Sequence, residues 1–327
     1  MAPPASRPPL IFDRRLVRRR RDRAARLFPD HDFLVRLAVK DLLDRAASTT
    51  RDFPRALAIG GGGLAGELLA ESALADRVGL LVEADLSPRL ASRSAGLAVA
   101  ADEELLPFAD GAFDLVLAPL TLHWTNDLPG ALIQINNALK PDGFFAGALF
   151  GGATLTELRQ SLLAAEAESG AAAARVSPFA DARDLGGLLQ RARFAMPVAD
   201  TDRHTVRYAD PARLFADLRG MGESNALSER HALGRRAFAR AMHIYAERFA
   251  LPDGRLPATF EIVTATGWAP APGQPKPLRP GSAKQRLADA LGVKESRLSD
   301  DSTAPAVHTA RTNDRTFRQI RRRVRWT

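Results

Sequence analysis

The run Arg55-Ala56-Leu57-Ala58-Ile59-Gly60-Gly61-Gly62-Gly63 opens a stretch that decides the fold and ends in Glu83-Ala84-Asp85. An apolar strand that breaks into glycines, followed by a helix and a second strand ending in an acid, is typical of a nucleoside-binding turn. The glycines let a ligand approach the backbone and let the amides of the next helix face an anion. Asp85 is placed to accept hydrogen bonds from a ribose. A flexible loop between strand and helix is the alternative that this motif alone leaves open.

The composition favours a globular protein with a sizeable core. Of the 327 residues, 46% are hydrophobic, and the chain contains no cysteine. No stretch reaches the roughly 18 uninterrupted apolar residues of a membrane-spanning helix, and no secretory signal is recognisable. The lack of cysteine excludes disulfides, thiolate metal sites and a cysteine nucleophile. We therefore expect a cytoplasmic protein.

The net charge of +8 is concentrated near both ends of the chain. Residues 11–26 and 311–327 each carry a net charge of +6, which leaves the remainder at −4. A basic groove for nucleic acid is therefore not expected in the body of the protein. The arginine-rich ends are compatible with an acidic protein or a membrane surface, and solvated helix faces are the commoner explanation.

Apolar periodicity predicts a doubly wound α/β fold with a mostly parallel sheet covered on both faces. Two helices are expected before the first strand, over residues 13–27 and 31–46. Strands are then expected at 55–60, 79–84, 96–100, 114–120 and 143–150, and helices at 64–71, from residue 88 and at 128–139. Ligands of such sheets bind beyond the carboxyl ends of the strands, where the glycine turn, Asp85 and Asp102 fall.

The chain after residue 150 is expected to add helical insertions and closing strands to the same domain. Helices are expected at 154–168, 184–193, 211–220 and 229–249, and strands at 198–208 and 257–266. A proline-rich extended segment is expected from 268 to 280, and a disordered tail from 293. The predicted boundaries are 1–50 for the N-terminus and helical lead-in, 51–150 for the core, 151–292 for the insertions and closing strands, and 293–327 for the tail.

Three further motifs follow the glycine turn in order. Val99 to Phe108 predicts a strand that ends at Asp102 and Glu103 and runs into a Leu-Pro-Phe turn. An acid there can accept a hydrogen bond from an adenine amino group beside a dry surface. The other two motifs are Phe113-Asp114-Leu115-Val116, a strand that leads to His123, and Leu139-Lys140-Pro141-Asp142-Gly143, a helix end, a turn and a new strand.

In this order the motifs resemble those of the class I S-adenosylmethionine-dependent methyltransferases over residues 55–150. The resemblance implies a Rossmann-like domain that binds S-adenosylmethionine. The residues that it implies at the cofactor are Gly60, Gly61, Gly62, Asp85, Leu86, Asp102 and Glu103. Asp85 would hold the ribose hydroxyls, and Asp102 with Glu103 would lie beside the adenine. The family usually has an acidic residue two positions before the first glycine, where this sequence has Ala58.

A more extensive resemblance, to the family of complex I assembly factor 5, covers most of the chain up to residue 292. The matching motifs lie at 11–14, 123–130, 151–159, 175–179, 217–225, 267–268 and 276–283. This resemblance implies a role in assembling the respiratory NADH:ubiquinone oxidoreductase, with arginine hydroxylation reported for the mitochondrial branch. The chain is similar, more distantly, to the methyltransferase that esterifies malonyl carrier protein in biotin synthesis.

His123 is the candidate catalytic residue, because it follows the fourth strand, where a substrate would meet the methyl group. A neutral imidazole can accept a proton there, and capping of the strand end is the alternative. The candidate substrate-side residues are Trp124, Asn126, Arg159 and Tyr208, for which a core position, a helix cap or a solvated surface is the alternative. The spacing of the six histidines indicates no metal site, and so no iron for a hydroxylation.

We therefore expect an S-adenosylmethionine-dependent, methyltransferase-like enzyme that modifies or matures a subunit of respiratory complex I. Whether the chemistry is methylation or arginine hydroxylation stays open. The alternatives are an O-methyltransferase acting on a small or carrier-bound carboxylate and a catalytically silent assembly chaperone. Ala58 favours the silent alternative, whereas Asp85 and Asp102 favour retained binding. The expected partner is a protein subunit rather than nucleic acid, and peripheral contact with the inner membrane is compatible with this role.

Overall fold

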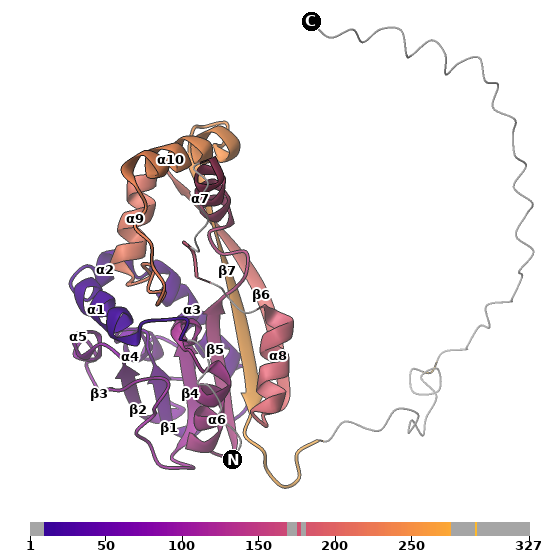
Figure 1. The fold of residues 1–327 in the computed structure, drawn as a ribbon. Coiled ribbons are helices and arrows are strands. Elements are labelled where there is room, and N and C mark those ends of the chain that lie inside the picture. The colour runs from indigo at the N-terminus through magenta and orange to yellow at the C-terminus, as the bar shows by residue number, and fades with distance from the viewer. Residues whose placement is uncertain (1–9, 169–174, 178–180, 276–291, 293–327) are drawn as a thin grey trace, which may run out of the picture. The chain divides into compact units, whose positions relative to one another are not determined.

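A computed structural model describes residues 10–168, 175–177, 181–275 and 292 of the 327 (Figure 1). The described residues from 10 to 274 belong to one compact unit. The tail expected to be disordered, the motif at 276–283 and part of the motif at 175–179 lie outside the described residues.

This unit is built on a seven-stranded sheet with the strand order β3-β2-β1-β4-β5-β7-β6. Its strands are β1 (Phe53–Ile59), β2 (Val78–Asp85), β3 (Leu97–Ala100), β4 (Phe113–Pro119), β5 (Leu139–Phe150), β6 (Ala195–Tyr208) and β7 (Leu256–Trp268). Strands β1 to β5 are parallel, whereas β7 runs antiparallel to both β5 and β6. The predicted mostly parallel sheet is confirmed. The strand order reverses between β1 and β4, and the carboxyl ends of these strands are where sheets of this kind bind ligands.

Helices cover both faces of the sheet. They are α1 (Arg14–Ala24), α2 (Phe28–His31), α3 (Phe33–Ala47), α4 (Leu64–Leu69), α5 (Pro88–Ala91), α6 (Leu128–Ala138), α7 (Thr156–Glu168), α8 (Ala182–Arg191), α9 (Pro211–Gly220) and α10 (Arg235–Phe249), with the 3-10 turn η1 (Leu122–Trp124). One apolar core includes α3, α4, α7, α9 and α10, and the other packs α6 and α8 against the opposite face. Helices α7 and α10 lie together near one end of the long β6–β7 pair (Figure 1).

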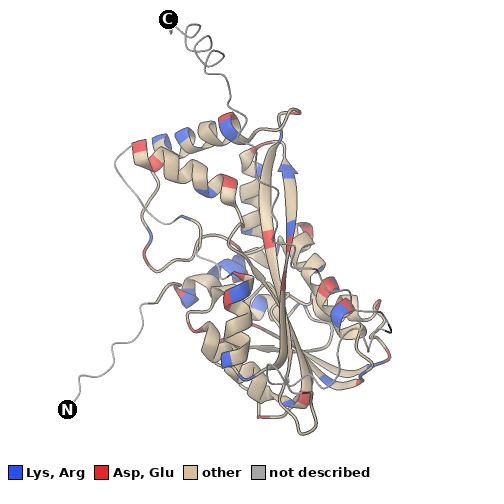
Figure 2. Cartoon of the chain, turned by 90° about the vertical axis from the view of Figure 1, so that its right-hand side faces the viewer, with Lys and Arg blue, Asp and Glu red and all other residues tan. Residues whose placement is uncertain are grey.

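Positions of basic and acidic residues alternate along the outer helices in the coloured ribbon of Figure 2. Among the described helices, none is both long enough and apolar enough to cross a membrane.

Several element boundaries differ from those expected. The helix expected over 13–27 ends at Ala24, and Pro29 lies in the separate α2, because proline has no amide hydrogen to continue the α-helical ladder. The helix expected from residue 229 begins only at Arg235, after the extended Gly234. Strand β5 begins at Leu139 rather than 143, with a register shift opposite β4 and Asp142 at φ 65°. The expected turn is therefore an irregularity within a strand.

Helix α1 starts at a side-chain cap, and the face that it buries includes an arginine. The Asp13 carboxylate accepts a hydrogen bond from the Leu16 amide at 3.0 Å, which satisfies one open donor of the first turn. The buried residues Val17, Arg21 and Ala24 are spaced four and three residues apart, so they share one side of the helix. An arginine therefore points from α1 into the protein.

The core contribution of the parallel strands can be tested at Leu57, which is fully buried in β1. Leu57→Ala should lower the free energy of unfolding by about 3 kcal/mol, because it removes apolar contacts and leaves a cavity. Urea denaturation followed by circular dichroism measures the change. Leu80→Ala in β2, at a side chain that is 42% exposed, is the matched control and should cost less than about 1 kcal/mol. Equal losses would contradict this packing.

Candidate functional site

The glycine turn after β1 lies at the reversal of strand order. Gly60, Gly61, Gly62 and Gly63 have φ angles of 81°, 84°, 58° and 90°, a region that other residues rarely adopt. A Cβ atom on Gly60 would lie 2.7 Å from Thr121 Cβ, and one on Gly62 would lie 2.9 Å from Phe28 Cε1. The turn therefore requires glycine because the chain's own side chains approach it closely.

Asp85 ends β2 beside this turn and is buried. Its Oδ1 accepts a hydrogen bond from the Ser87 amide at 2.8 Å, and Ser87 in turn caps α5 through the Leu90 amide. Burial raises the pKa of Asp85 to about 6, although the positive charge of Arg21 opposes the shift. The carboxylate is thus rigidly placed and titrates close to neutral pH.

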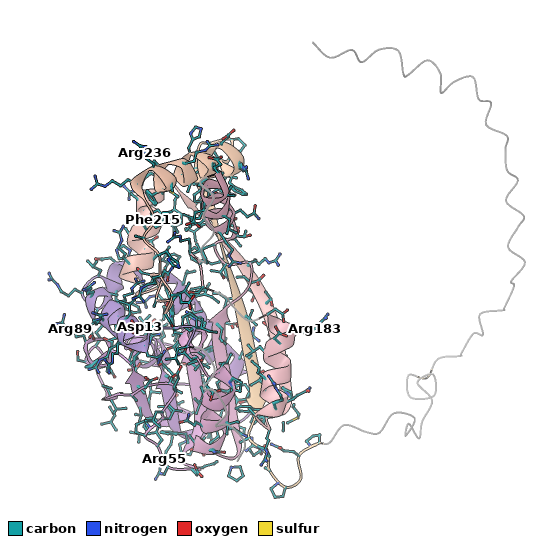
Figure 3. All side chains as sticks on the ribbon, in the orientation of Figure 1. Asp13, Arg55, Arg89, Arg183, Phe215 and Arg236 are labelled. Carbon is teal, nitrogen blue, oxygen red and sulfur yellow. The ribbon has the colours of Figure 1, made fainter. Side chains whose placement is uncertain are left out.

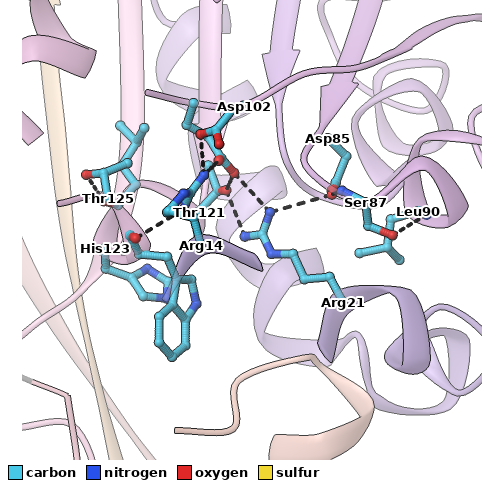
Figure 4. A network of polar contacts seen from close by, with 12 residues as sticks. Arg14, Arg21, Asp85, Ser87, Leu90, Asp102, Thr121, His123 and Thr125 are labelled. Atoms are coloured by element: carbon cyan, nitrogen blue, oxygen red, sulfur yellow. Dashed lines mark hydrogen bonds and ion pairs between the residues drawn. The ribbon is translucent and has the colours of Figure 1, made fainter. Parts of the chain in front are cut away.

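The Arg21 guanidinium reaches from α1 into the space between two carboxylates (Figure 4). Its Nη1 lies 3.0 Å from Glu103 Oε1 and 3.5 Å from Asp85 Oδ1, and its Nη2 donates a 2.7 Å hydrogen bond to Thr121 Oγ1. Thr121 Oγ1 also donates to Glu103 Oε1. These contacts join three strand ends of the sheet to α1.

Arg14 closes the other side of the same cluster. Its Nη2 donates to Asp102 Oδ1 at 2.5 Å and to Glu103 Oε2, while its Nη1 donates to the Trp124 carbonyl at 3.1 Å. Burial alone would raise the pKa of Glu103, but Arg21 and Arg14 outweigh it and hold the pKa below its usual value. Glu103 is therefore an ionised carboxylate, stabilised by two guanidinium groups.

His123 and Trp124 in η1 meet a carboxylate from the loop after α9. The His123 Nε2 atom lies 3.0 Å from Glu223 Oε2, and Trp124 Nε1 donates to the same oxygen at 3.0 Å. A carboxylate can only accept, so Glu223 accepts a hydrogen bond from both ring N–H groups and fixes the orientation of the imidazole and the indole.

A cavity of about 180 Å³ lies next to this group. Its apolar walls are Trp124, Phe150, Leu155, Leu158, Leu162, Val176, Phe215, Leu218 and Phe260. Its polar lining is Thr154, Arg175, Ser177, Arg219, Glu223, Ser224 and Asn225. Phe215, which is labelled in Figure 3, comes from α9. Such a mostly apolar cavity with a few polar groups is typical of a ligand site.

A second, much smaller cavity of about 20 Å³ lies at the glycine turn. It is lined by Arg21, Phe28, Val35, Gly61, Gly62, Asp85, Leu90, Pro119, Leu120, Met221 and Glu223. Glu223 is the residue that lines both cavities, so it forms part of the wall between them.

The other sequence-predicted residues take varied places. Leu86 packs with Phe12 and Trp124 in a small apolar cluster under α1. Asn126 holds the N-terminal segment, because its Oδ1 accepts from the Phe12 amide at 2.8 Å. Arg159 donates to the carbonyls of Gly152 and Thr154, and Tyr208 is buried in the larger core, so neither lines either cavity. Their substrate-side role stays a prediction.

Sequence reasoning did not single out Arg14, Arg21 or Glu223 as site residues. The signal for Arg21 was its spacing from Val17 and Ala24, which puts an arginine on the apolar face of a helix. Nothing in the spacing of Glu223 indicated its approach to His123. Among the described residues, no group of three or more His, Asp or Glu side chains is placed to hold a metal ion.

The residue types at the crevice suit a nucleoside linked to an amino acid, but the cavity at the glycine turn is too small to hold one. Buried carboxylates end β2 and follow β3, and the glycine turn presents its backbone between them. These are the groups that a ribose and an adenine amino group require. However, Arg21 and Phe28 line the space at the turn, and the remaining 20 Å³ is close to the room needed by one water molecule.

Comparison with known proteins matches the core to one family model and the chain to curated relatives. Residues 57–147 match the model of a methyltransferase domain. The chain is 42% identical over 289 residues to the arginine-hydroxylase NDUFAF5, mitochondrial, of Danio rerio, covering 85% of this chain and 89% of the relative. It is 35% identical over 268 residues to the malonyl-[acyl-carrier protein] O-methyltransferase of Halorhodospira halophila, covering 79% of this chain and 88% of the relative.

Among solved structures, the YcgJ protein of Bacillus subtilis resembles the chain with a TM-score of 0.50. The sequence identity is 14%, and the match covers 71% of this chain and 99% of that protein. This likeness concerns the fold alone.

The buried arginine cluster predicts an effect on stability. Arg14→Gln removes charged hydrogen bonds to Asp102 and Glu103, while Arg21 still balances Glu103. The free energy of unfolding should therefore fall by about 2 kcal/mol. Arg18→Gln on the exposed side of α1 is the control and should change it by less than about 0.5 kcal/mol. Chemical denaturation compares the two, and a loss no greater for Arg14→Gln than for Arg18→Gln would show that the cluster contributes nothing.

Proposed function

Because this chain belongs to the family of the arginine-hydroxylase NDUFAF5, we propose that it is an S-adenosylmethionine-dependent, methyltransferase-like enzyme that modifies a subunit of respiratory complex I during assembly. The observation that carries the proposal is the position of Glu223 between the crevice at the glycine turn and the apolar cavity. A cofactor on one side and an acceptor on the other would meet beside this residue and His123.

The crevice would take the cofactor. Asp85 would accept hydrogen bonds from the ribose hydroxyls, and Asp102 and Glu103 would lie beside the adenine. S-adenosylmethionine would supply a methyl group on a sulfonium, from which a neutral thioether is a good leaving group, so the protein's task is mainly to position the acceptor. The methyltransferase domain matched over residues 57–147 supports this assignment.

The apolar cavity would take the acceptor side chain. An arginine combines an apolar stem with a planar guanidinium that pairs well with a carboxylate. Leu158, Leu162 and Phe260 offer apolar walls for the stem, and Glu223 offers the carboxylate. Hydrogen bonds from His123 and Trp124 hold that carboxylate, yet its oxygens have further lone pairs for a guanidinium.

A carboxylate acceptor is the second candidate. Arg219 and Arg175 line the same cavity, and the chain is also related to the malonyl-[acyl-carrier protein] O-methyltransferases. Arg175 already binds Glu166, through an Nε donor at 2.9 Å, which leaves Arg219 as the better anion partner. Glu223 would repel a carboxylate, so the cavity as a whole favours a cationic acceptor.

The cofactor assignment predicts a pH dependence of binding. Asp85 has a pKa of about 6, so it is ionised at about pH 7.5 and largely protonated at about pH 5. A protonated acid accepts fewer hydrogen bonds, and affinity for S-adenosylmethionine should therefore fall as the pH drops through about 6.

Calorimetric titration of the wild-type protein, Asp85→Asn and the exposed control Asp110→Asn checks this dependence. We expect Asp85→Asn to bind at least about tenfold more weakly at about pH 7.5, because it loses a charged acceptor. Its affinity should also change little with pH, while Asp110→Asn follows the wild type. No uptake of S-adenosylmethionine by the wild type, or equal binding by Asp85→Asn, would refute the cofactor site.

The acceptor assignment can be tested in the source organism. A deletion strain complemented with Glu223→Gln should lose a modification on one complex I subunit and accumulate less assembled complex, because the carboxylate that receives the acceptor is gone. Intact-mass analysis of the subunits shows whether a methyl or a hydroxyl group is missing, and native electrophoresis measures the assembled complex. Unchanged subunit masses and normal assembly in the deletion strain itself would contradict the proposed function.

A further inference from the structure

We propose that the N-terminal segment, residues 10–31, is a built-in cover of the cofactor crevice, in which Arg21 competes with the nucleoside for Asp85. The inference rests on the proposed function, because it concerns the ligand of that same crevice. The inference goes beyond the proposed function, because it makes ligand binding depend on the displacement of residues 10–31 of this chain. Three independent features of the structure support it.

The first feature is the pairing of both carboxylates with arginines. Asp85 Oδ1 is already 2.8 Å from the Ser87 amide and 3.5 Å from Arg21 Nη1. Both oxygens of Glu103 face arginines, Oε1 at 3.0 Å from Arg21 Nη1 and Oε2 toward Arg14. A ribose diol that approaches Asp85 Oδ1 from the side of Glu103 would have to displace the Arg21 guanidinium, which lies between the two acids.

The second feature is the lack of room. The cavity at the glycine turn holds about 20 Å³, whereas sites for ligands of this size hold about 300 Å³ or more. Arg21 and Phe28, both from the N-terminal segment, line this cavity, and Phe28 lies against Gly62. The space required by the methionine portion is therefore closed by side chains of α1 and α2.

The third feature is the way the segment is attached. Its first residues form a short antiparallel bridge, in which the Asp13 amide donates to the Ala226 carbonyl and the Ser228 amide donates to the Ile11 carbonyl, each near 2.9 Å. Phe12 packs edge-on against Trp124 with ring centroids 5.2 Å apart. The N-terminal segment thus contacts both the crevice and the loop that carries Glu223. Its displacement would therefore change the walls of both cavities.

The charge of the ligand gives the cover a specific signature. S-adenosylmethionine carries a sulfonium and has a net charge of +1, whereas the product S-adenosylhomocysteine is a neutral thioether with no net charge. The Arg21 guanidinium, displaced from Asp85 but still carried on α1 next to the crevice, would repel the first more than the second. Loss of Arg21 should therefore improve binding of S-adenosylmethionine more than binding of the product.

The test is calorimetric titration of the full chain with both ligands. Arg21→Gln should bind S-adenosylmethionine about tenfold more tightly than the wild type, because the competitor is removed. The gain for S-adenosylhomocysteine should be smaller. Glu103 keeps Arg14 and Thr121 as partners in this variant. Loss of the Arg21 charge raises the pKa of Asp85 further, so all variants are titrated at about pH 8.5, where Asp85 stays ionised. Arg19→Gln, on the exposed side of the same helix, removes the same charge and should stay within about twofold of the wild type.

A disulfide provides a second test that does not depend on the stability of Arg21→Gln. The chain contains no cysteine, and a Cβ built on Gly222 lies 3.6 Å from Ala24 Cβ, within the range of a disulfide. The variant Ala24→Cys/Gly222→Cys therefore links α1 to the loop after α9 when oxidised. Comparison of the oxidised and reduced states of one protein cancels any strain at Gly222.

We expect the oxidised variant to bind neither ligand and the reduced variant to recover binding. Weaker binding by Arg21→Gln would show that Arg21 is a ligand contact, and that result overturns the cover. Equal binding by Arg21→Gln and the wild type, or tight binding by the oxidised variant, overturns it as well while leaving the proposed function intact. Absence of binding in the wild type, Arg21→Gln and the reduced variant alike would refute the cofactor of the proposed function and the cover with it.

Discussion

The buried pairing of Arg21 with Glu103 and Asp85 is the contact on which the rest of the site depends. The cluster ties α1 to the ends of the central strands, and Thr121 and Arg14 complete its hydrogen bonds. An isolated buried charge is costly, so carboxylates at these strand ends need either these guanidinium groups or another set of partners. The same acids that would recognise a nucleoside therefore also fix the position of the N-terminal segment.

Glu223 extends this dependence to the acceptor side. The loop that carries it follows α9 and is bridged to residues 11–13 by backbone hydrogen bonds. The Glu223 carboxylate accepts hydrogen bonds from His123 and Trp124, in the turn that follows β4. Glu223 also lines both cavities. One protein wall thus separates a polar, charged crevice from an apolar cavity, an arrangement suited to joining a charged cofactor to a long side chain.

The sequence predicts the sheet well, because parallel strands that are buried on both faces consist of consecutive apolar residues. The turn after Ile59 and the acid at Asp85 were likewise readable from local spacing. Arg21 and Glu223 were missed as site residues, because their partners lie 82 and 100 positions away and such pairs depend on tertiary packing. The substrate-side role of Asn126 stays a prediction, because the contact that the fold reveals is with Phe12.

The central claim is that the crevice at Asp85 binds S-adenosylmethionine. Before the ligand binds, the Arg21 guanidinium lies where the ligand's ribose would contact Asp85. A crystal structure of the full chain with S-adenosylhomocysteine tests this most directly. The account predicts ribose hydroxyls on the Asp85 carboxylate, the methionine portion at Gly60 and Gly62, and the Arg21 guanidinium displaced from Asp85. A nucleoside bound elsewhere, or bound at Asp85 with Arg21 still between Asp85 and Glu103, would contradict it.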